Sequence, residues 1–286
     1  ATGNFFKLKP GDSALHGLPT NFIAGKMMLV RAIILGLELD VVEPTSNLVF
    51  NYNKHYKFSA MVPLQLQNSL MHIKYIDTII VGGASVSKSL YNAIQDANTS
   101  IYETYGMTET VTHIAVKKLN NFASLQRGTT WQSAKSFFKT LPNVNIFQDE
   151  RGCLIIHAPK LSKEKIITND IIKLHSETEF EWLGRYDNVI NSGGVKLFPE
   201  RIEEKLQTII KKRFFIASKK DAILGEQLIL VIEDEKHLDA ILKEVKDLIT
   251  LDKYEIPKQV YSVLKFIETP SGKIQRKKTL ESVLFN

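Results

Sequence analysis

Apolar positions near the start of the chain recur first at the spacing of a helix and then at that of a strand. From residue 22 to residue 35 they repeat at helical intervals, directly after Pro19 and Asn21, which are common near helix starts. The short apolar run at residues 39–44 predicts a strand that ends at Pro44, because proline cannot donate a ladder hydrogen bond. A helix followed by a strand is therefore expected here.

The middle of the chain continues this alternation. Residues 75–87, YIDTIIVGGASVS, predict a buried strand that runs into a glycine turn, and residues 88–97 predict the next helix. Residues 119–141 are polar without clear periodicity, and no element is predicted there. Alternating strands and helices indicate an α/β fold. The further strand-like segments are residues 100–106, 112–119, 143–148, 152–158 and 179–185.

A second group of elements follows the segment GRYDNVINSGG, residues 184–194. Residues 199–213 predict an amphipathic helix with Pro199 in its first turn, acidic residues early and basic residues late, as the helix dipole favours. We expect two domains, residues 1–186 and 187–286, with the boundary at Asp187. The apolar patterns after residue 213 predict two strands, at residues 214–220 and 227–234. A helix at residues 237–251 and a strand at residues 259–268 are expected to follow.

Composition narrows the class of protein. Hydrophobic residues make up 44% and charged residues 24% of the 286 residues, as in soluble globular proteins. The longest apolar run, residues 27–37, contains Arg31 and is too short to span a membrane, and no cleavable secretory signal is visible. Cys153 is the only cysteine, which excludes an intrachain disulfide and favours a reducing compartment. The cytoplasm is the expected location.

The charge pattern argues against nucleic acid as a partner. Lys and Arg number 37 and Asp and Glu 31, an excess of six that is spread along the chain. The densest basic cluster, GKIQRKK at residues 272–278, contains no aromatic residue that could stack on a base. Neither nucleic acid nor a membrane is expected as a partner, and the sequence does not give the oligomeric state.

The first candidate for chemistry is the glycine turn together with YGMTE. Gly82 and Gly83 at the end of a strand would let a flat ligand approach the backbone. Tyr105 offers an aromatic face, Thr108 a hydroxyl for a phosphate, and Glu109 a hard oxygen for Mg²⁺. The alternatives are a tight turn, a core tyrosine, a strand threonine and a surface carboxylate.

Two further candidates lie later in the chain. Asp170 could accept both hydroxyls of a ribose, and Arg185 could reach ribose oxygens or a phosphate. Lys273 follows a turn-forming PSG segment and would present a compact positive charge on a loop. A turn residue, a surface charge and a solvated lysine are the respective alternatives.

These motifs, in this order and spacing, resemble the core motifs of the adenylate-forming acyl-CoA synthetase superfamily, and the resemblance covers nearly the whole chain. That family includes acid–CoA ligases, luciferases and the adenylation domains of peptide synthetases. Residues 18–44 are most similar to o-succinylbenzoate–CoA ligases of menaquinone biosynthesis, which carry a similar GxxxxxRA stretch. The matching segments are GGASVS, YGMTE, TND, GRYDNVINSGGVKLFPERIEE and TPSGKIQRKK.

The resemblance implies an ATP-dependent acid–CoA ligase with a larger adenylate-forming domain, incomplete here, and a small mobile C-terminal domain. In such enzymes a carboxylate attacks the α-phosphate of ATP to give acyl-AMP and pyrophosphate, and the thiol of CoA then displaces AMP. ATP, Mg²⁺ and CoA are thus the expected cofactors and co-substrates. The expected substrate is a small carboxylic acid.

The resemblance also implies a role for each matching position in nucleotide binding. Tyr105 is expected to stack on the adenine beside Gly83 and Ala84. Gly82 and Gly106 belong to the same adenylate-binding set.

The expected catalytic residues are Thr108, Glu109 and Lys273. Thr108 would touch the α-phosphate, Glu109 would hold Mg²⁺, and Lys273 would bridge the α-phosphate and the attacking carboxylate. Asp170 and Arg185 would hold the ribose. Because two anions must meet in the first step, cationic groups have to neutralise the phosphate oxygens.

The small domain would change position between the two half-reactions. Asp187 matches the family's hinge, and Gly193 and Gly194 match a loop that faces the acyl and CoA tunnel in the second conformation. Lys196 would assist there, with a surface lysine as the alternative. Such a movement would let Lys273 leave before the thiol arrives.

The chain also departs from the family pattern. The glycine- and hydroxyl-rich phosphate loop has no counterpart here, and ATGNFF at residues 1–6 does not qualify. We infer that the native protein extends upstream of Ala1, and that this chain binds the β- and γ-phosphates poorly, so that its own activity stays open. Asn169 replaces a glycine, a change that a left-handed asparagine could absorb. Phe22 stands where histidine or another aromatic residue is frequent.

The identity of the carboxylic acid is a weaker inference. An aromatic dicarboxylate needs a cation for its second carboxylate, which Lys26 or Arg31 could supply, unless Arg31 faces solvent. An amino-acid or aryl-acid adenylation enzyme that loads a carrier protein is the alternative, although we find no aspartate suited to clamp an α-amino group near Gly82. The third hypothesis is a nucleotide-binding module without catalysis, or a protein that docks nucleic acid through its basic tail, and the missing phosphate loop favours it.

Overall fold

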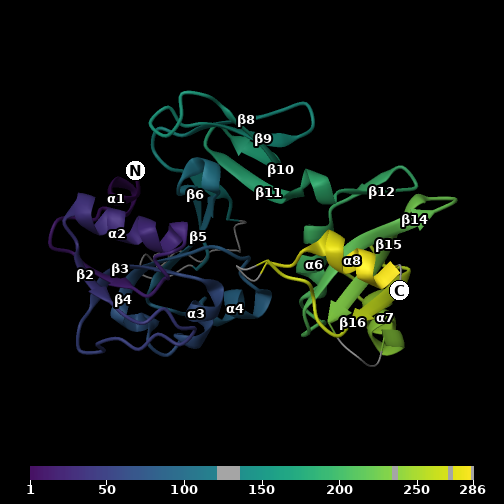
Figure 1. The fold of residues 1–286 in the computed structure, drawn as a ribbon, viewed down its shortest axis with the longest axis horizontal. Helices are drawn as coiled ribbons and strands as arrows, with labels where there is room; N and C mark the ends of the chain where they lie inside the picture. Colours follow the sequence, from purple (N-terminus) through teal and green to yellow (C-terminus); the bar gives the residue numbers. More distant parts are fainter. Residues whose placement is uncertain (121–135, 234–237, 270–272, 285–286) are drawn as a thin grey trace. The chain divides into compact units, whose positions relative to one another are not determined.

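The computed structural model describes residues 1–120, 136–233, 238–269 and 273–284 (Figure 1). The chain divides into two compact units. The large unit comprises Ala1–Thr168 and Lys173–Glu181, and the small unit comprises Asn169–Ile172 and Trp182–Asn286. The predicted domain boundary at Asp187 remains a prediction.

Within the described residues, eleven strands form one sheet in the order β2-β1-β3-β4-β5-β6-β7-β11-β10-β9-β8. Strands β10 and β11 contribute residues to both units. The parallel part comprises β2 (Glu38–Val41), β1 (Ser13–His16), β3 (Tyr56–Met61), β4 (Ile76–Val81) and β5 (Ser100–Gly106). The rest, in which β5–β6, β6–β7, β7–β11 and β8–β9 pair antiparallel, comprises β6 (His113–Lys118), β7 (Phe138–Thr140), β11 (Glu179–Arg185), β10 (Ile166–Ser176), β9 (Cys153–His157) and β8 (Asn145–Gln148).

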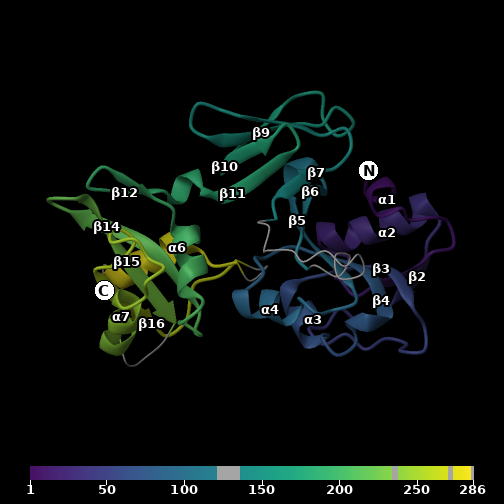
Figure 2. The same cartoon turned by 180° about the vertical axis from the view of Figure 1, so that it is seen from behind.

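Helices cover both faces of the parallel strands (Figures 1 and 2). Helices α1 (Thr2–Phe6) and α2 (Ile23–Leu35) cover one face, whose core includes Ala14, Met28 and Phe58. Helix α3 (Pro63–Asn68), the 3₁₀ turn η1 (Ile73–Tyr75) and helix α4 (Lys88–Ala93) cover the other, whose core includes Leu15 and Leu90. Ala14 and Leu15 enter different cores because successive side chains of a strand point to opposite faces.

Helix α2 is fixed at both ends by glycine. Gly36 has φ 65° and closes the helix in the left-handed conformation that glycine adopts without a steric penalty. Gly25 lies against the preceding loop, where a Cβ would be 2.2 Å from the carbonyl oxygen of Pro19. The helix can therefore approach this loop only because residue 25 has no side chain.

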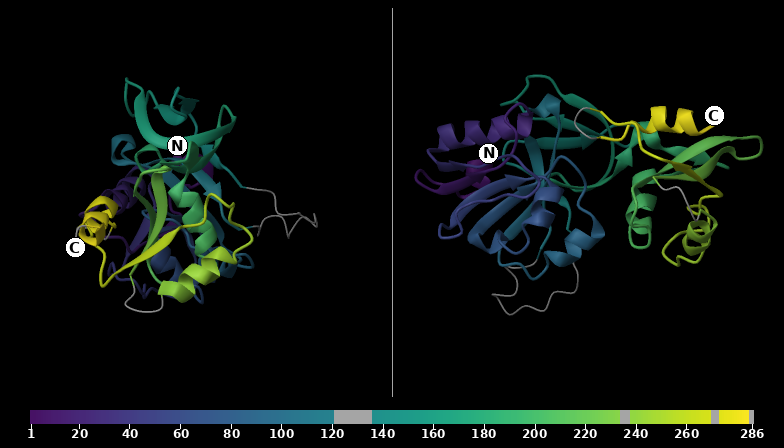
Figure 3. Two further views of the ribbon diagram at one scale, coloured as in Figure 1. Left: turned by 90° about the vertical axis from the view of Figure 1, so that its right-hand side faces the viewer. Right: turned by 60° about the horizontal axis from the view of Figure 1, so that its bottom comes forward.

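The small unit is a second, smaller α/β arrangement. Its sheet has the order β13-β12-β15-β14, and β16 pairs with β15. Helices α6 and α7 pack on one face of the sheet and α8 on the other (Figure 3). Its elements are η3 (Tyr186–Asn188), β12 (Ile190–Ser192), β13 (Val195–Leu197), α6 (Pro199–Leu206), β14 (Phe214–Asp221), β15 (Gly225–Glu233), α7 (Leu238–Lys246), β16 (Gln259–Val263) and α8 (Arg276–Leu284).

The α/β fold class is confirmed, with differences in detail. The helices predicted at residues 88–97 and 199–213 end earlier, at Ala93 and Leu206. Strand β7 falls in the segment without a prediction, of which residues 121–135 lie outside the described ranges. None of the helices in the described ranges combines the length and apolarity that a membrane crossing requires. Besides β7, the helices and strands not predicted are α1, β1, β3, α3, β10, β12, β13 and α8.

Candidate active site

The glycine turn lies at the carboxyl end of β4. A Cβ on Gly82 would be 2.4 Å from the Thr104 hydroxyl on β5, so a side chain there would displace this hydroxyl from its bond to the Val81 carbonyl. Gly83 has φ +86°, and a Cβ on it would meet only a methyl group of Val62, at 3.7 Å. The backbone conformation, rather than a lack of space, therefore disfavours a side chain there. Gly83 and Ala84 are exposed. The turn thus presents bare backbone to a ligand.

Tyr105 lies one residue beyond this contact, near the end of β5. Its ring meets Phe180 of β11 edge-on at 5.2 Å and Phe138 of β7 at 5.8 Å between ring centres. Phe180 is fully buried, and it stacks on Phe138 in turn. These two phenylalanines fix the plane of the Tyr105 ring, and neither contact was predicted from the sequence.

The 3₁₀ turn η2 (Thr108–Thr110) presents the two exposed residues Thr108 and Glu109. The fully buried Thr110 holds the turn from below: its hydroxyl accepts from the Met107 amide at 3.0 Å and lies 2.8 Å from the Thr112 carbonyl oxygen. Thr108 and Glu109 therefore project from a backbone that is already ordered.

The chain returns into β6 through two tight contacts. A Cβ on Gly106 would lie 2.5 Å from the Cα of His113, so glycine is required for this approach. Val111 has φ 61° and ψ −40°, an unusual conformation for a β-branched residue. The Thr112 amide donates to the Thr110 carbonyl across Val111, which makes this a γ-turn. Backbone strain is thus located directly beside Thr108 and Glu109.

Arg31 of α2 is buried beside this turn, so the alternative that it faces solvent is wrong. It is 7% exposed, and its Nη2 donates to Thr112 Oγ1 at 2.8 Å and lies 3.2 Å from Nδ1 of His113. Burial lowers the pKa of Arg31 to about 10, so the guanidinium stays charged at neutral pH. In the part of the chain that the structure describes, Arg31 has no carboxylate partner. Lys26 is exposed.

His113 is the neutral neighbour of this cation. Burial, followed by the charge of Arg31, lowers the pKa of His113 to about 3. With Nδ1 accepting from Arg31, the proton belongs on Nε2, which lies 3.4 Å from the hydroxyl of Thr2. The pair therefore keeps a net positive charge inside the large unit, and the sequence did not single out His113 or Thr112.

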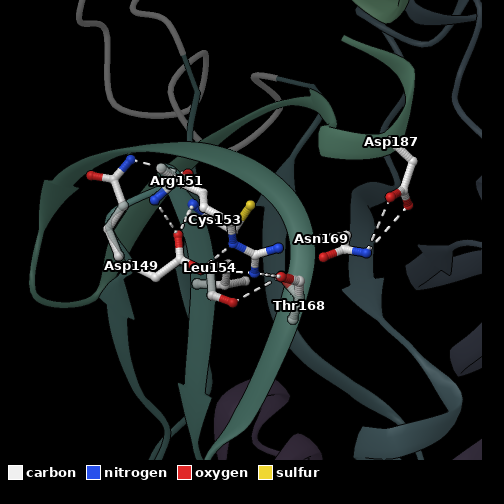
Figure 4. Close-up of polar contacts among 9 residues, drawn as sticks. Asp149, Arg151, Cys153, Leu154, Thr168, Asn169 and Asp187 are labelled. Atoms are coloured by element: carbon white, nitrogen blue, oxygen red, sulfur yellow. Dashed lines mark hydrogen bonds and ion pairs between the residues drawn. The ribbon is translucent and has the colours of Figure 1, made fainter.

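The predicted ribose residues lie together in the small unit. Asp170 is buried, and Nε of Arg185 lies 3.7 Å from one of its carboxylate oxygens. Nη2 of Arg185 donates to Asp187 at 3.0 Å. Asp187, the predicted hinge residue, also accepts from the side-chain amide of Asn169 at 3.3 Å on each oxygen (Figure 4). One arginine thus contacts both the candidate ribose carboxylate and the candidate hinge.

The expectation of a left-handed backbone at Asn169 is wrong. Asn169 lies within β10 and is not among the non-glycine residues with positive φ. An extended strand accepts a side chain at this position, and the asparagine amide binds Asp187 instead.

The strand that leads to Asn169 is anchored in the large unit. The hydroxyl of Thr168 donates to the Leu154 carbonyl at 2.8 Å, and Nη2 of Arg151 donates to the Thr168 carbonyl at 3.1 Å (Figure 4). Asp149 accepts from the amides of Arg151 and Cys153 and so orders the turn that carries Arg151. These bonds hold β10 against β9 just before Asp170.

The hairpin β12–β13 carries Gly193 and Gly194, with φ +58° and +81°. Ser192 pairs with Val195, so the loop has two residues, and positive φ at both is the type I′ turn for which Gly-Gly is suited. Lys196 is exposed on β13. The glycines therefore have a sufficient structural reason, and the tunnel role of this loop and of Lys196 stays a prediction.

Lys273 is exposed, and its backbone is bound on both sides. Its amide donates to the Thr269 hydroxyl at 3.1 Å, and its carbonyl accepts from the Thr269 amide at 2.8 Å. Gln275, two residues on, donates from its amide to the Ile267 carbonyl. The segment that carries Lys273 is therefore tied to Ile267 and Thr269, which lie between β16 and Lys273. Residues 270–272 lie outside the described ranges.

Glu109 is the carboxylate that the sequence predicts for Mg²⁺. Within the described residues no group of three or more His, Cys, Asp or Glu side chains could hold a metal. Mg²⁺ often binds through one or two carboxylates together with water and substrate phosphates, which the exposed Glu109 fits. The structure brings Gly82–Ala84, Tyr105–Glu109 and Arg31 together in the large unit, and Asp170, Arg185 and Asp187 together in the small unit.

A protein-family model described as AMP-binding enzyme matches residues 1–153, more than half of the chain. The chain belongs to this family of AMP-binding enzymes. A solved structure from Dyadobacter fermentans, an acyl-CoA synthetase (AMP-forming)/AMP-acid ligase II-like protein, is 36% identical to this AMP-binding chain. It has a TM-score of 0.60, and the match covers 98% of this chain and 81% of that one.

Curated relatives of the AMP-binding chain are more distant. The 2-succinylbenzoate–CoA ligase of Listeria monocytogenes is 26% identical, over 94% of this chain and 61% of the relative. The 3,4-dihydroxybenzoate–[aryl-carrier protein] ligase of Bacillus anthracis is 24% identical, over 81% of this chain and 53% of the relative. The chain thus spans about 61% of the length of the first of these relatives.

The fold is also shared with a ligase solved together with an adenylate. The o-succinylbenzoate CoA synthetase of Bacillus subtilis, in complex with the acyl-adenylate intermediate OSB-AMP, has a TM-score of 0.77 and 18% identity to this chain. The match covers 97% of this chain and 62% of that one. At this identity the likeness concerns the fold.

Proposed function

We propose that the protein to which this chain belongs is an ATP-dependent acid–CoA ligase. The observation that carries the proposal is the arrangement at the ends of β4 and β5. There the bare backbone of Gly83, the fixed ring of Tyr105 and the ordered turn of Thr108 and Glu109 lie on neighbouring strands. A flat base next to a phosphate needs this combination of backbone, aromatic face and hydroxyl.

In the large unit, the adenine would lie between the Gly83–Ala84 backbone and the ring of Tyr105. Thr108 would donate its hydroxyl hydrogen to an oxygen of the α-phosphate. Glu109 would hold Mg²⁺, which when bound would neutralise part of the phosphate charge. The buried Thr110 would keep Thr108 and Glu109 in place without a conformational cost at the moment of reaction.

In the small unit, Asp170 and Arg185 would bind the ribose hydroxyls. The ammonium of Lys273 would contact both the α-phosphate and the substrate carboxylate, whose mutual repulsion it would reduce. A carboxylate oxygen then attacks the α-phosphorus, the bond to the bridging oxygen breaks, and pyrophosphate leaves. Acyl-AMP remains bound.

Before the second half-reaction, Lys273 would have to move away from the α-phosphate. The sulfur of CoA attacks the acyl carbon, the carbon–oxygen bond to AMP breaks, and the thiol proton goes to solvent. A rotation at Asp187 would replace Lys273 by the β12–β13 hairpin with Lys196. This conformational role of the hairpin is part of the proposal.

We further propose that the acid carries a second carboxylate, as o-succinylbenzoate does. Both hydrogen bonds of Arg31 to Thr112 and His113 start from Nη2, so the described residues leave its Nε and Nη1 donors for an anion. A buried cation without a carboxylate partner is costly unless a ligand compensates it. The exposed Lys26 is the weaker candidate for this contact.

The test is a comparison of acids with the protein as its gene encodes it. With ATP, Mg²⁺ and CoA, we expect o-succinylbenzoate to give pyrophosphate and an acyl-CoA in equal amounts. Pyrophosphate release with another acid but none with o-succinylbenzoate would remove the assignment of the substrate. No release with any acid would remove the ligase itself and leave a nucleotide-binding module.

Loading of a carrier protein is the second candidate, because one relative of this chain is an aryl-carrier protein ligase. The acyl acceptor distinguishes the two functions. An acid–CoA ligase transfers the acyl group to free CoA, whereas a carrier-protein ligase transfers it only to a phosphopantetheinyl carrier.

A cytoplasmic location is also proposed, since the only cysteine, Cys153, is buried and free.

A further inference from the structure

Arg276, the first residue of α8, binds helix α6 through a two-pronged ion pair. Its Nη1 and Nη2 lie 2.7 and 2.8 Å from the two carboxylate oxygens of Glu203. The guanidinium also lies over the ring of the buried Phe215, 5.7 Å from its centre. The planar fork of arginine can make both contacts at once, which a lysine cannot.

Glu203 is itself largely withdrawn from solvent, with 12% of its side chain exposed. One of its oxygens accepts from the Ile216 amide of β14 at 2.8 Å. Burial raises the pKa of Glu203, and the charge of Arg276 and its hydrogen bonds oppose this rise. The carboxylate would be unfavourable here without its arginine, so the geometry of the pair is tightly set.

The same arginine reaches toward the turn that follows Asp187. Nη1 of Arg276 lies 3.9 Å from Glu200, whose carboxylate accepts a short hydrogen bond from the side-chain amide of Asn188. The other oxygen of Glu200 is buried without a described partner, and it occupies the space that a side chain on Gly184 would need. Asn188, Glu200, Arg276 and Glu203 thus form a continuous polar chain within the small unit.

This polar chain joins the candidate hinge to the candidate catalytic lysine. Asn188 directly follows Asp187, and Arg276 follows Lys273 by three residues, a reach of at most about 10 Å. Between Lys273 and Arg276, Gln275 is bound to the Ile267 and Glu268 carbonyls. The Lys273 backbone therefore has fixed points on both sides, one at Thr269 and the other at Arg276.

We propose that Arg276 is a positioning residue for adenylation: it holds the backbone of Lys273 against α6, so that Lys273 and the turn after Asp187 move as one rigid body. This inference rests on the proposed function. It assigns to Arg276 no contact with substrate. Its role is to keep the ammonium of Lys273 at the α-phosphate once the small unit has turned into place.

The first test separates the two half-reactions in Arg276→Gln. We expect acid-dependent exchange of pyrophosphate into ATP to fall by about tenfold to a hundredfold, the usual effect of a displaced catalytic group. Thioester formation from supplied acyl adenylate, which does not use Lys273, should keep its rate. Lys205→Gln, which breaks the ion pair of α6 with Glu255 but is not part of the polar chain, is the matched control and should behave as the unchanged protein.

The second test combines Arg276→Gln with Lys273→Ala. If Arg276 acts only through Lys273, the double variant exchanges pyrophosphate no more slowly than Lys273→Ala alone. A further fall in the double variant, or an equal loss in both half-reactions of Arg276→Gln, would overturn the positioning role.

The third test needs no activity. Amide hydrogen exchange of this chain should be faster at Gln275, whose amide is bonded to Ile267, in Arg276→Gln than in Lys205→Gln. Should Arg276→Gln fail to fold, Arg276→Lys replaces it, with a smaller change in the same direction. Unchanged exchange at Gln275 would overturn the inference. A Lys273→Ala variant that adenylates normally would instead contradict the proposed function and leave the exchange result standing.

Discussion

Two arginines in this chain, one buried and one partly buried, have different surroundings. Arg31 in the large unit is 7% exposed and binds a threonine hydroxyl and a neutral histidine, with no carboxylate partner among the described residues. Arg276 in the small unit has a 29% exposed side chain and binds both oxygens of Glu203. The positive charge of Arg31 therefore has no negative partner among the described residues, whereas that of Arg276 is neutralised by Glu203.

The difference separates a binding residue from a positioning residue. A compensated buried charge fixes two elements to each other, because removing either partner leaves the other charge unpaired. An uncompensated buried charge makes no such connection and is stabilised when an anion arrives. Arg31 is therefore suited to a ligand carboxylate, and Arg276 to the internal order of the small unit. Substitutions of Arg31 and of Arg276 test this difference.

The largest effect on stability is expected at Arg276. Arg276→Met leaves the Glu203 carboxylate buried without its partner, which should lower the free energy of unfolding of the small unit by about 3 kcal/mol. Urea denaturation followed by a probe in the small unit measures this. Lys205→Met, which removes a more exposed ion pair, should cost less than about 1 kcal/mol. Equal losses in the two variants would show that the Glu203 pair is not special.

Arg31→Met should affect the substrate more than the fold. Losing the bonds to Thr112 and His113 is offset by removing an unpaired charge, so we expect stability to stay within about 1 kcal/mol of the unchanged protein. The KM for o-succinylbenzoate should rise by about tenfold to a hundredfold, with no comparable rise for benzoate. An equal rise for both acids would exclude a contact with the second carboxylate.

The neutral state of His113 should make stability depend on pH. Its pKa in the folded chain, about 3, lies below the ordinary value of 6.5, so the unfolded chain binds more protons between these values. Stability contributed by neutral His113 is present above pH 6.5 and falls as the pH is lowered, by about 1.4 kcal/mol per pH unit.

Denaturation midpoints measured from neutral pH downward test this dependence. His113→Gln should show a flatter decline with falling pH, and so should Arg31→Met, because the charge of Arg31 contributes to the low pKa of His113. Identical slopes in all three proteins would contradict a buried neutral His113 beside Arg31.

The smallest effect is expected at Asn169. Its two bonds to Asp187 are long and lie near the surface, so Asn169→Gly should change the unfolding free energy by less than about 1 kcal/mol. We expect a slightly altered ratio of the two half-reaction rates, measured as pyrophosphate exchange against thioester formation. A large loss of adenylation alone would instead place Asn169 in the ribose site.

The sequence was sufficient where a local pattern decides the structure. Strands β4 and β5 and the turn at Gly82–Gly83 were predicted because a run of apolar residues ends at glycine and YGMTE begins at the end of the next strand. Helix ends were predicted less well: Ile94 and Ile210 continue the apolar periods of α4 and α6 and pack into the same cores, yet both lie beyond the helix ends at Ala93 and Leu206. Periodicity alone cannot separate a helix from the turn after it.

The contacts that define the candidate site could not be predicted because they join distant parts of the chain. Arg31 and Thr112 are 81 positions apart, and Arg276 and Glu203 are 73 apart. The helical spacing around Arg31 does not show which face of α2 lies against β6. Burial and solvent exposure of the Arg31 side chain therefore remained equal alternatives. The short hairpin β12–β13 was also missed, since three-residue strands show no period.

We propose that the protein to which this chain belongs activates a carboxylic acid on a nucleotide held at Gly83, Tyr105 and Glu109. The most direct measurement is exchange of labelled pyrophosphate into ATP by the protein as its gene encodes it, with and without o-succinylbenzoate. We expect exchange only in the presence of the acid, and no exchange in Glu109→Ala. Exchange that is absent with every carboxylic acid, in a protein that is folded, would contradict it.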